Sequence, residues 1–372
     1  MMMKRLNKAL LFFKKEPILV ISALAAAASC IPVPPDAAYF GYIDFRTLSL
    51  LYALMLVVAG LRKAGAFTHL AHLVCARAKT ARGMGMVLVA MTFFSSMLIT
   101  NDVALLTFVP FAIVLLGMTG RRDDLITIVV LQTVAANLGS MLTPVGNPQN
   151  LYLYSFYDLS ASDFFRITAP LWGLSLLLSL SLCLLLPRVT LRVDLGEEPG
   201  MERRSLCLYL ALFAVCLLSV LRLLPWPVML LLVAAALLIF ERKMLLGADF
   251  MLLLTFVAFF IFSGNLARLD AVSRLLRQLL SGREYLTALL ASQFISNVPA
   301  ALLLSGFTDN ARELLLGVDI GGLGTPIASL ASLISLKLYS RSRGAHTLRY
   351  LSVFTLVNLL LLAILSAARL LF

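Results

Sequence analysis

Apolar runs long enough to span a membrane follow one another along the whole chain, and no polar segment longer than about 20 residues separates them. Hydrophobic residues make up 61% of the 372 residues, charged residues make up 13%, and the mean hydropathy is +0.96. A backbone in lipid must satisfy its own hydrogen bonds, and runs of this kind do so as helices. We therefore predict an all-α polytopic membrane protein with about nine full spans.

The net charge of +12 does not indicate nucleic-acid binding in such a chain. Lysines and arginines are concentrated in the short segments between apolar runs, as the positive-inside rule expects of a multi-pass membrane protein. The basic segment 1–16 predicts a cytoplasmic N-terminus, and the order of the spans then predicts a periplasmic C-terminus.

The stretch 84–118 has a single charge, Asp102, which stands beside Thr100 and Asn101 at its middle. Each arm of about 15 residues would reach only about 22 Å as a helix, less than the roughly 30 Å hydrocarbon core. We therefore expect a re-entrant hairpin whose tip lies at mid-membrane. An acid at that depth is costly, so Asp102 is a candidate functional residue.

The apolar segment 125–156 is expected to be a broken helix. Pro144, Pro148, Gly139 and Gly146 lie inside it, and they cannot all sit in one regular helix without freeing backbone groups. Freed carbonyls and half-helix ends at membrane depth are what transporters use to bind ions and anions.

The second half of the chain repeats this pattern. Segment 285–308 is a second candidate hairpin with Ser296 and Asn297 at its tip, and 314–339 is a second candidate broken helix. The motif Gly-x-x-x-Thr-Pro starts at Gly139 in the first half and at Gly321 in the second. Such agreement between halves indicates an internal repeat.

We expect the two repeats to be inverted relative to each other. The predicted parts are a first repeat, 1–186, a cytoplasmic linker, 187–204, a connecting span, 205–222, and a second repeat, 223–372. Each repeat has an even number of crossings, so the connecting span turns the second repeat over and the two hairpins open on opposite sides.

These motifs resemble the ion transporter superfamily, which includes arsenite permeases, sodium-coupled dicarboxylate symporters and citrate permeases. The resemblance is carried by Thr-Asn-Asp at Thr100 and Ser-Asn-Val-Pro at Ser296, and by Thr-Pro-Val-Gly-Asn-Pro-Gln-Asn and Gly-Gly-Leu-Gly-Thr-Pro-Ile-Ala-Ser after the hairpins. The resemblance covers most of the chain. Within the superfamily, the chain is most similar to bacterial inner-membrane anion permeases of undetermined substrate. Dicarboxylate symporters carry Ser-Asn-Thr at both tips, whereas this chain has Asp102 and Val298 in the third place, which argues against a dicarboxylate substrate. The pair of Asn101 and Asp102 is more like the arrangement in arsenite permeases.

The resemblance implies elevator-like alternating access, a homodimer in the inner membrane, and a substrate and ion site built from both halves. It implies possible sodium sites at Asn101 and Asn297. The candidate substrate- and ion-binding residues are Thr100, Asn101, Asp102, Asn137, Gly139, Thr143, Gly146, Asn147, Ser296, Asn297, Asp319, Thr325, Ala328 and Ser329.

We expect a secondary active transporter for a small anion or oxyanion, arsenite-like or carboxylate, coupled to H⁺ or Na⁺. Asp102 is the candidate proton carrier or sodium ligand, and Asp319 is either a second such acid or a cap of the broken helix. An anion channel using the same hairpins is the alternative. The chain has no Gly-x-Ser-x-Gly and no His-Glu-x-x-His motif, so we expect no enzyme, and no cofactor beyond the coupling ion.

Overall fold

The computed structural model describes residues 16–75, 78–118, 121–190 and 200–372, and its regular elements in these parts are helices. Eight of the described helical segments are long and apolar enough to cross a membrane, and shorter apolar helices accompany them. The protein is a polytopic helical membrane protein, which confirms the fold class expected from the sequence.

The first half ends with a broken helix and a long crossing helix. Its main helices are α2 (Pro17–Ser29), α4 (Phe45–Lys63), α5 (Ala66–Cys75), α6 (Ala81–Ile99), α7 (Asn101–Met118), α8 (Leu125–Gly139), α9 (Pro148–Phe156) and α10 (Ala161–Leu182). Two short 3₁₀ turns, Ser140–Leu142 and Pro144–Gly146, separate α8 from α9. The helix therefore breaks where the prolines and glycines cluster.

One helix, α11 (Arg203–Val220), connects this half to the second. The second half contains α12 (Trp226–Phe240), α13 (Phe250–Ala267), α14 (Asp270–Leu280), α15 (Glu284–Ile295), α16 (Asn297–Leu304), α17 (Ala311–Ile320), α18 (Leu330–Ser340) and α19 (Thr347–Ala368). Here α17 and α18 are the two parts of the second broken helix.

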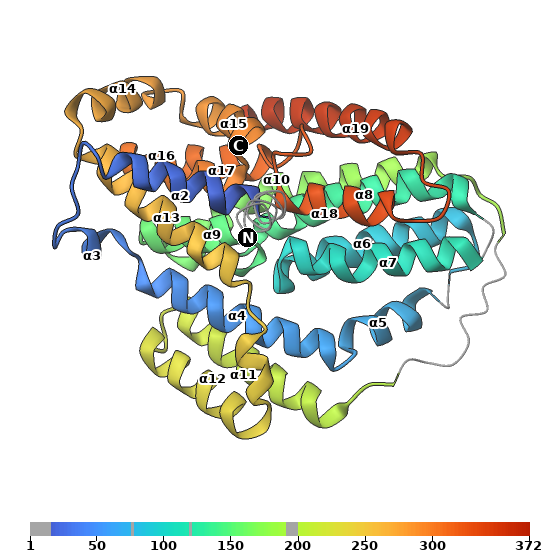
Figure 1. The fold of residues 1–372 in the computed structure, drawn as a ribbon. Coiled ribbons are helices and arrows are strands. Elements are labelled where there is room, and N and C mark those ends of the chain that lie inside the picture. The colour runs from blue at the N-terminus through green and yellow to red at the C-terminus, as the bar shows by residue number, and fades with distance from the viewer. Residues whose placement is uncertain (1–15, 76–77, 119–120, 191–199) are drawn as a thin grey trace, which may run out of the picture.

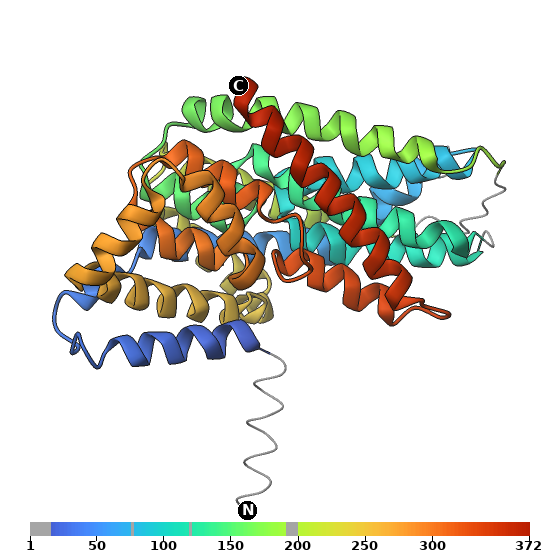
Figure 2. The same ribbon diagram turned by 90° about the horizontal axis from the view of Figure 1, so that it is seen from above.

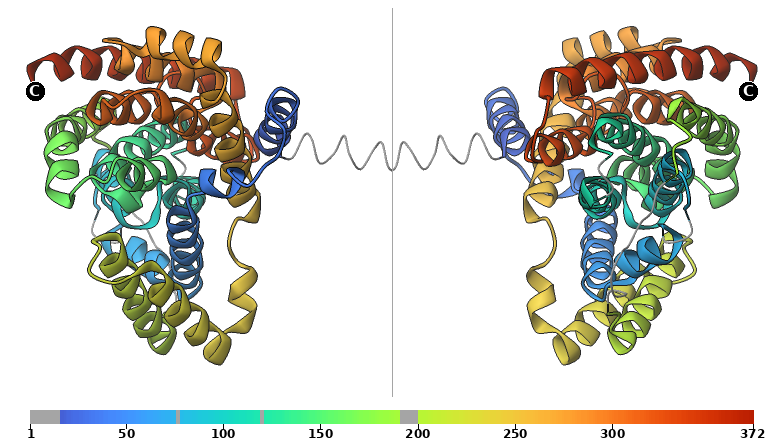
Figure 3. Two further views of the ribbon diagram at one scale, coloured as in Figure 1. Left: turned by 90° about the vertical axis from the view of Figure 1, so that its left-hand side faces the viewer. Right: turned by 90° about the vertical axis from the view of Figure 1, so that its right-hand side faces the viewer.

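Helices of the two halves are interleaved in space. α2 packs along α13, and α11 and α12 pack against α4. Figure 3 shows α11 and α12 extending from the body on the side where α4 lies. Viewed from above, α19 runs diagonally over other helices, and its C-terminal end meets α10 at the edge of the molecule (Figure 2). The buried apolar residues form one large cluster around α4, α11, α13 and α16, and another around α6, α8 and α19.

The two hairpins point toward each other. In Figure 1, α6 and α7 bring their tip from one end of the molecule to its middle, and α15 and α16 bring theirs from the other end. Both tips lie against helix breaks, because Asn101 contacts Asn137 at the end of α8 and the Asn297 N–H donates to the Ala328 carbonyl before α18. This is the arrangement of an inverted repeat.

The expected arm length of the first hairpin is wrong. α6 has 19 residues and α7 has 18, so each reaches about 27 Å, close to the thickness of the hydrocarbon core. The helix starts at Ala81, before the expected residue 84, because the Thr80 hydroxyl accepts a hydrogen bond from the Gly83 N–H at 3.0 Å. The position of the tip beside the helix breaks, and not the arm length, identifies the hairpin.

Backbone geometry repeats between the halves as closely as the sequence motifs do. Thr100 has φ 69° and ψ 147°, and Ser296 has φ 71° and ψ 155°. Asp44, which caps α4, has φ −80° and ψ 87°, while Asp249, which caps α13, has φ −79° and ψ 87°. Equivalent positions therefore adopt the same turns in both halves.

Candidate functional site

Each hairpin turns at one residue with an unusual backbone conformation. Thr100 and Ser296 are not glycines, yet both have positive φ with extended ψ. Such a conformation costs about 1–3 kcal/mol and persists only where the surroundings enforce it. Strain of this kind concentrates at functional sites, which fits the expectation that both tips belong to one.

The residue after each turn begins the returning helix in the same way. The Asn101 side-chain oxygen accepts a hydrogen bond from the Asp102 N–H at 3.0 Å, and that of Asn297 accepts one from the Val298 N–H at 3.0 Å. Both asparagines are buried, with 4% of their surface exposed. The Asn101 side-chain nitrogen donates to Asn137, and that of Asn297 lies beside Gly322, so both face the helix breaks.

Asn137 lies at the centre of a buried polar network that joins the halves. Its side-chain oxygen accepts hydrogen bonds from Asn101 Nδ2 at 3.2 Å and from Ser329 Oγ at 2.9 Å. Its nitrogen donates to Ser332 Oγ at 3.3 Å and to the Gly322 carbonyl at 3.4 Å. The first hairpin tip, the first helix break and the second helix break are thus connected through one carboxamide.

The second hairpin is fixed to its own helix break by Gln293. This side chain donates to the Gly321 carbonyl at 2.8 Å and to the Leu323 carbonyl at 2.9 Å, and it accepts from the Thr325 N–H at 2.9 Å. The Ala328 carbonyl accepts from the Asn297 N–H at 2.9 Å and from the Ser296 hydroxyl at 3.4 Å. The Ala328 carbonyl is therefore occupied by the hairpin tip.

Two threonines hold the hairpins to the breaks in equivalent positions. The Thr143 hydroxyl donates to the Met97 carbonyl of α6, and the Thr325 hydroxyl donates to the Gln293 carbonyl of α15 at 3.0 Å. Both contacts come from the Thr-Pro of the repeated motif. They position the backbone and leave neither hydroxyl proton for a ligand.

Two of the candidate glycines are needed for close backbone approach. A Cβ on Gly139 would lie 2.2 Å from the Phe93 carbonyl oxygen of α6, and one on Gly146 would lie 2.0 Å from the Ser140 carbonyl oxygen. No side chain fits at such distances. These positions shape the break and pack the hairpin arm against it.

Asp319 is buried among carboxamides of the first helix break. Its Oδ1 accepts from Asn147 Nδ2 and from Gln149 Nε2, each at 3.4 Å. Asn150 completes the set when its nitrogen faces the carboxylate, 2.8 Å from Oδ1 and 3.2 Å from Oδ2. Asp319 is not among the residues that line the cavity described next, so its surroundings are this amide cage.

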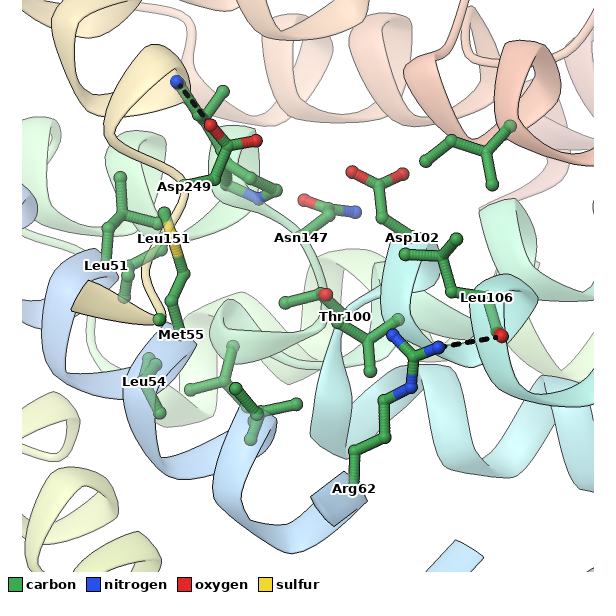
Figure 4. Close-up of a pocket in the computed structure, with 18 of the residues that line it drawn as sticks. Leu51, Leu54, Met55, Arg62, Thr100, Asp102, Leu106, Asn147, Leu151 and Asp249 are labelled. Carbon is green, nitrogen blue, oxygen red and sulfur yellow. Dashed lines mark hydrogen bonds between the residues drawn. The ribbon is translucent and has the colours of Figure 1, made fainter. Parts of the chain in front are cut away.

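A cavity of about 570 Å³ lies between α4 and the tip of the first hairpin. Thr100, Asp102 and Asn147 line it, and so do apolar residues of α4 such as Leu51 and Leu54 (Figure 4). The N-terminal ends of α7 and α9 therefore face this space. Helix N-termini carry partial positive charge and favour anions.

Acidic groups occupy one side of the same cavity. Figure 4 shows the Asp102 and Asp249 carboxylates near Asn147, with Arg62 on the other side of Thr100. Asp102 Oδ1 is enclosed and has no hydrogen-bond partner among the described residues. The cavity thus has carboxylates suited to a cation beside the N-termini of α7 and α9, and a guanidinium suited to an anion on the other side of Thr100.

Several residues of the site were missed from the sequence alone. Asp249 looks like an ordinary helix cap at the membrane surface, and it does cap α13 through the Leu252 N–H at 3.0 Å, yet it also lines the cavity. Gln149 lies inside a motif that the sequence analysis quotes, and Gln293 lies just before the second hairpin tip, and their polarity in an apolar segment was the available signal. Arg62 ends a span, which gives no indication that it reaches a hairpin.

Comparison with known proteins identifies the class. Residues 9–313 match the family model described as citrate transporter. The chain belongs to the citrate transporter family. The resemblance to the ion transporter superfamily seen in the motifs is thereby confirmed, and this family member is a membrane transporter and not an enzyme.

Relatives of this citrate transporter family member are found in several kingdoms. The inner membrane protein YbiR of Escherichia coli K12 is 33% identical over 336 residues, which cover 87% of this chain and 89% of the relative. An uncharacterized transporter of Methanocaldococcus jannaschii is 31% identical over 300 residues, covering 80% and 82%. The silicon efflux transporter LSI3 of Oryza sativa subsp. japonica is 31% identical over 154 residues, covering 41% and 31%.

Proposed function

We propose that the protein is a secondary active transporter that moves a small anion or oxyanion across the membrane, coupled to H⁺ or Na⁺. The observation that carries this proposal is the cavity at the first hairpin tip, where Thr100, Asp102 and Asn147 meet the helix α4. Helix N-termini supply the partial positive charge for an anion, and a carboxylate supplies the charge for a cation. A transporter that couples the two needs both in one place.

Alternating access by an elevator-like movement of the hairpins is the proposed mechanism. Thr100 and Asp102 line the cavity, whereas Ser296 and Asn297 are 1% and 4% exposed and lie under the Ala328 segment. One hairpin tip is open and its repeat-related counterpart is covered. If the two repeats exchanged conformations, the first hairpin tip would become covered and the second would become open. The site would then face the opposite side of the membrane.

The substrate class we propose is a small oxyanion of arsenite type or a carboxylate. The family description names citrate and one relative is named for silicon efflux, so citrate and silicic acid join arsenite as the first compounds to test. Asp102 and Asp249 on the same cavity disfavour a multiply charged anion that arrives without a cation, because like charges repel in a site of low dielectric. This arrangement favours cotransport with H⁺ or Na⁺.

Asp102 is the proposed coupling residue, with Asn101 and Asn297 as possible sodium ligands. Asp102 has an enclosed oxygen without a partner in the described part of the chain, whereas Asp319 is surrounded by three carboxamides. We therefore assign Asp319 to the structure of the helix break and Asp102 to the ion. We further propose a homodimer in the bacterial inner membrane with its N-terminus in the cytoplasm and its C-terminus in the periplasm.

Flux measurements on purified protein in liposomes test the proposal. Citrate, arsenite, silicic acid, succinate, sulfate and chloride are offered singly, with and without sodium, at two pH values. A transporter gives uptake that saturates with substrate concentration and depends on sodium or pH. Uptake that rises linearly with concentration and ignores both ions would support the alternative, an anion channel with the same hairpins.

A further inference from the structure

The last turn of α4 reaches across the cavity to the first hairpin. Arg62 lines the cavity, and its Nη2 donates a hydrogen bond to the Leu106 carbonyl of α7 at 3.2 Å (Figure 4). The contact joins a helix of the surrounding body to a hairpin arm. Leu106 lies in the second turn of α7, so the contact is close to the hairpin tip.

The Leu106 carbonyl is available because of Pro110. In an α-helix the carbonyl of residue 106 would accept a hydrogen bond from the N–H of residue 110, and proline has no N–H. A carbonyl freed in this way inside a membrane protein must find another donor. Arg62 supplies it from a neighbouring helix.

The charge of Arg62 is not neutralised by a carboxylate in the described part of the chain. The neighbouring Lys63 forms an ion pair with Glu241 at 2.8 Å, whereas no ion pair between described residues involves Arg62. Its acceptor is a neutral backbone oxygen. The acidic residues of the cavity, Asp102 and Asp249, lie on the other side of Thr100 (Figure 4).

We propose that Arg62 recognises the anionic group of the substrate, and that the Leu106 carbonyl is its partner only while the cavity is empty. This inference rests on the proposed transport function and adds a specificity-determining residue to it. A guanidinium binds a carboxylate or oxyanion through two parallel hydrogen bonds, which are stronger than one bond to a neutral carbonyl. An anion entering the cavity therefore displaces Leu106.

The exchange of partners links binding to movement. When Arg62 leaves Leu106, the hydrogen bond between α4 and the hairpin arm is lost, and the hairpin becomes free to move relative to α4. A ligand shifts such an equilibrium only through different contacts in the two states, and the loss of this bond is such a difference.

Two variants should change substrate affinity in opposite directions. With citrate or sulfate as charged substrate, Arg62→Gln should raise KM about tenfold or more, because a charge-assisted pair is lost. Pro110→Ala restores the N–H that competes for the Leu106 carbonyl, so it should lower KM about threefold. Arg46→Gln is the matched control, because Arg46 lies at the other end of α4 and does not line the cavity, so its KM should stay near that of the unmodified protein.

Uptake into liposomes and thermal stabilisation by the same anion are measured for all three variants. Loss of stabilisation in Arg62→Gln, together with its raised KM, supports the inference. An unchanged KM in Arg62→Gln, or equal effects of Arg62→Gln and Arg46→Gln, would overturn it while leaving transport established. Uptake restricted to uncharged acids such as silicic acid would overturn it as well. No uptake of any compound by the unmodified protein would instead reject the proposed transport function, and the inference with it.

Discussion

Asn137 at the end of α8 and Ser329 at the start of α18 are joined by a hydrogen bond of 2.9 Å between the Ser329 hydroxyl and the Asn137 side-chain oxygen, although 192 residues separate them. The same oxygen accepts from Asn101 of the first hairpin. A single carboxamide thus fixes the relation between the two helix breaks and one hairpin tip.

Replacing Asn137 should therefore damage both stability and transport. Asn137→Ala leaves Asn101, Ser329 and Ser332 without their buried partner, at a cost of about 1–3 kcal/mol for an unsatisfied group. We expect a lower unfolding temperature in detergent and a loss of uptake. Asn358→Ala is the control, because Asn358 is equally buried but bonds only to the Phe354 carbonyl of its own helix in the described structure. Uptake retained by Asn137→Ala would contradict the role of this network.

Alanine in place of Gly146 should disrupt the helix break, whereas alanine in place of a glycine with free space around it should not. Gly146→Ala places a methyl group 2.0 Å from the Ser140 carbonyl oxygen, so the backbone of the helix break would have to shift. Gly117→Ala in α7 meets nothing within 4 Å and should stabilise the helix by up to about 1 kcal/mol. Expression level and unfolding temperature compare the two. Equal behaviour of both variants would argue against the tight turn at Gly146.

We expect Asp319 to stabilise the helix break and not to couple transport to an ion gradient. Asp319→Asn turns an acceptor-only group into one with a donor nitrogen, which then faces the nitrogens of Asn147, Gln149 or Asn150. We expect a loss of about 1–3 kcal/mol of stability, since buried donors lose their acceptor. The residual uptake should still respond to the ion gradient. A stable Asp319→Asn protein that has lost its gradient response would instead make Asp319 the coupling acid.

We expect Asp102, in contrast to Asp319, to be needed for ion coupling and not for stability. Asp102→Asn keeps the shape of the side chain and removes the charge from the cavity, so the protein should fold and melt normally but no longer couple uptake to H⁺ or Na⁺. Asp163→Asn removes an exposed carboxylate near the start of α10 and serves as the control. Coupled uptake by Asp102→Asn at the rate of the unmodified protein would exclude Asp102 from the mechanism.

The sequence predicted the repeat because its signal is local. Proline and glycine impose the breaks through their own backbone limits, so the Gly-x-x-x-Thr-Pro motifs mark them wherever they occur. The length of the first hairpin arm was underestimated because the Thr80 cap adds a turn that the apolar pattern does not show.

The contacts across the cavity could not be predicted in this way. Asp44 and Asp249 have nearly the same cap geometry, and only the packing of the neighbouring helices makes Asp249 line the cavity with Asp102. Likewise, Pro110 indicates a freed carbonyl in α7, but its partner Arg62 depends on how α4 lies beside the hairpin.

The most direct test of the account is accumulation against a concentration gradient. Liposomes containing the purified protein are given a labelled substrate anion at equal concentration inside and outside, and a pH or sodium gradient is then imposed. The account predicts that the anion accumulates on one side and returns to equilibrium when an ionophore removes the driving gradient. Anion movement that never exceeds equilibrium under either gradient would contradict it.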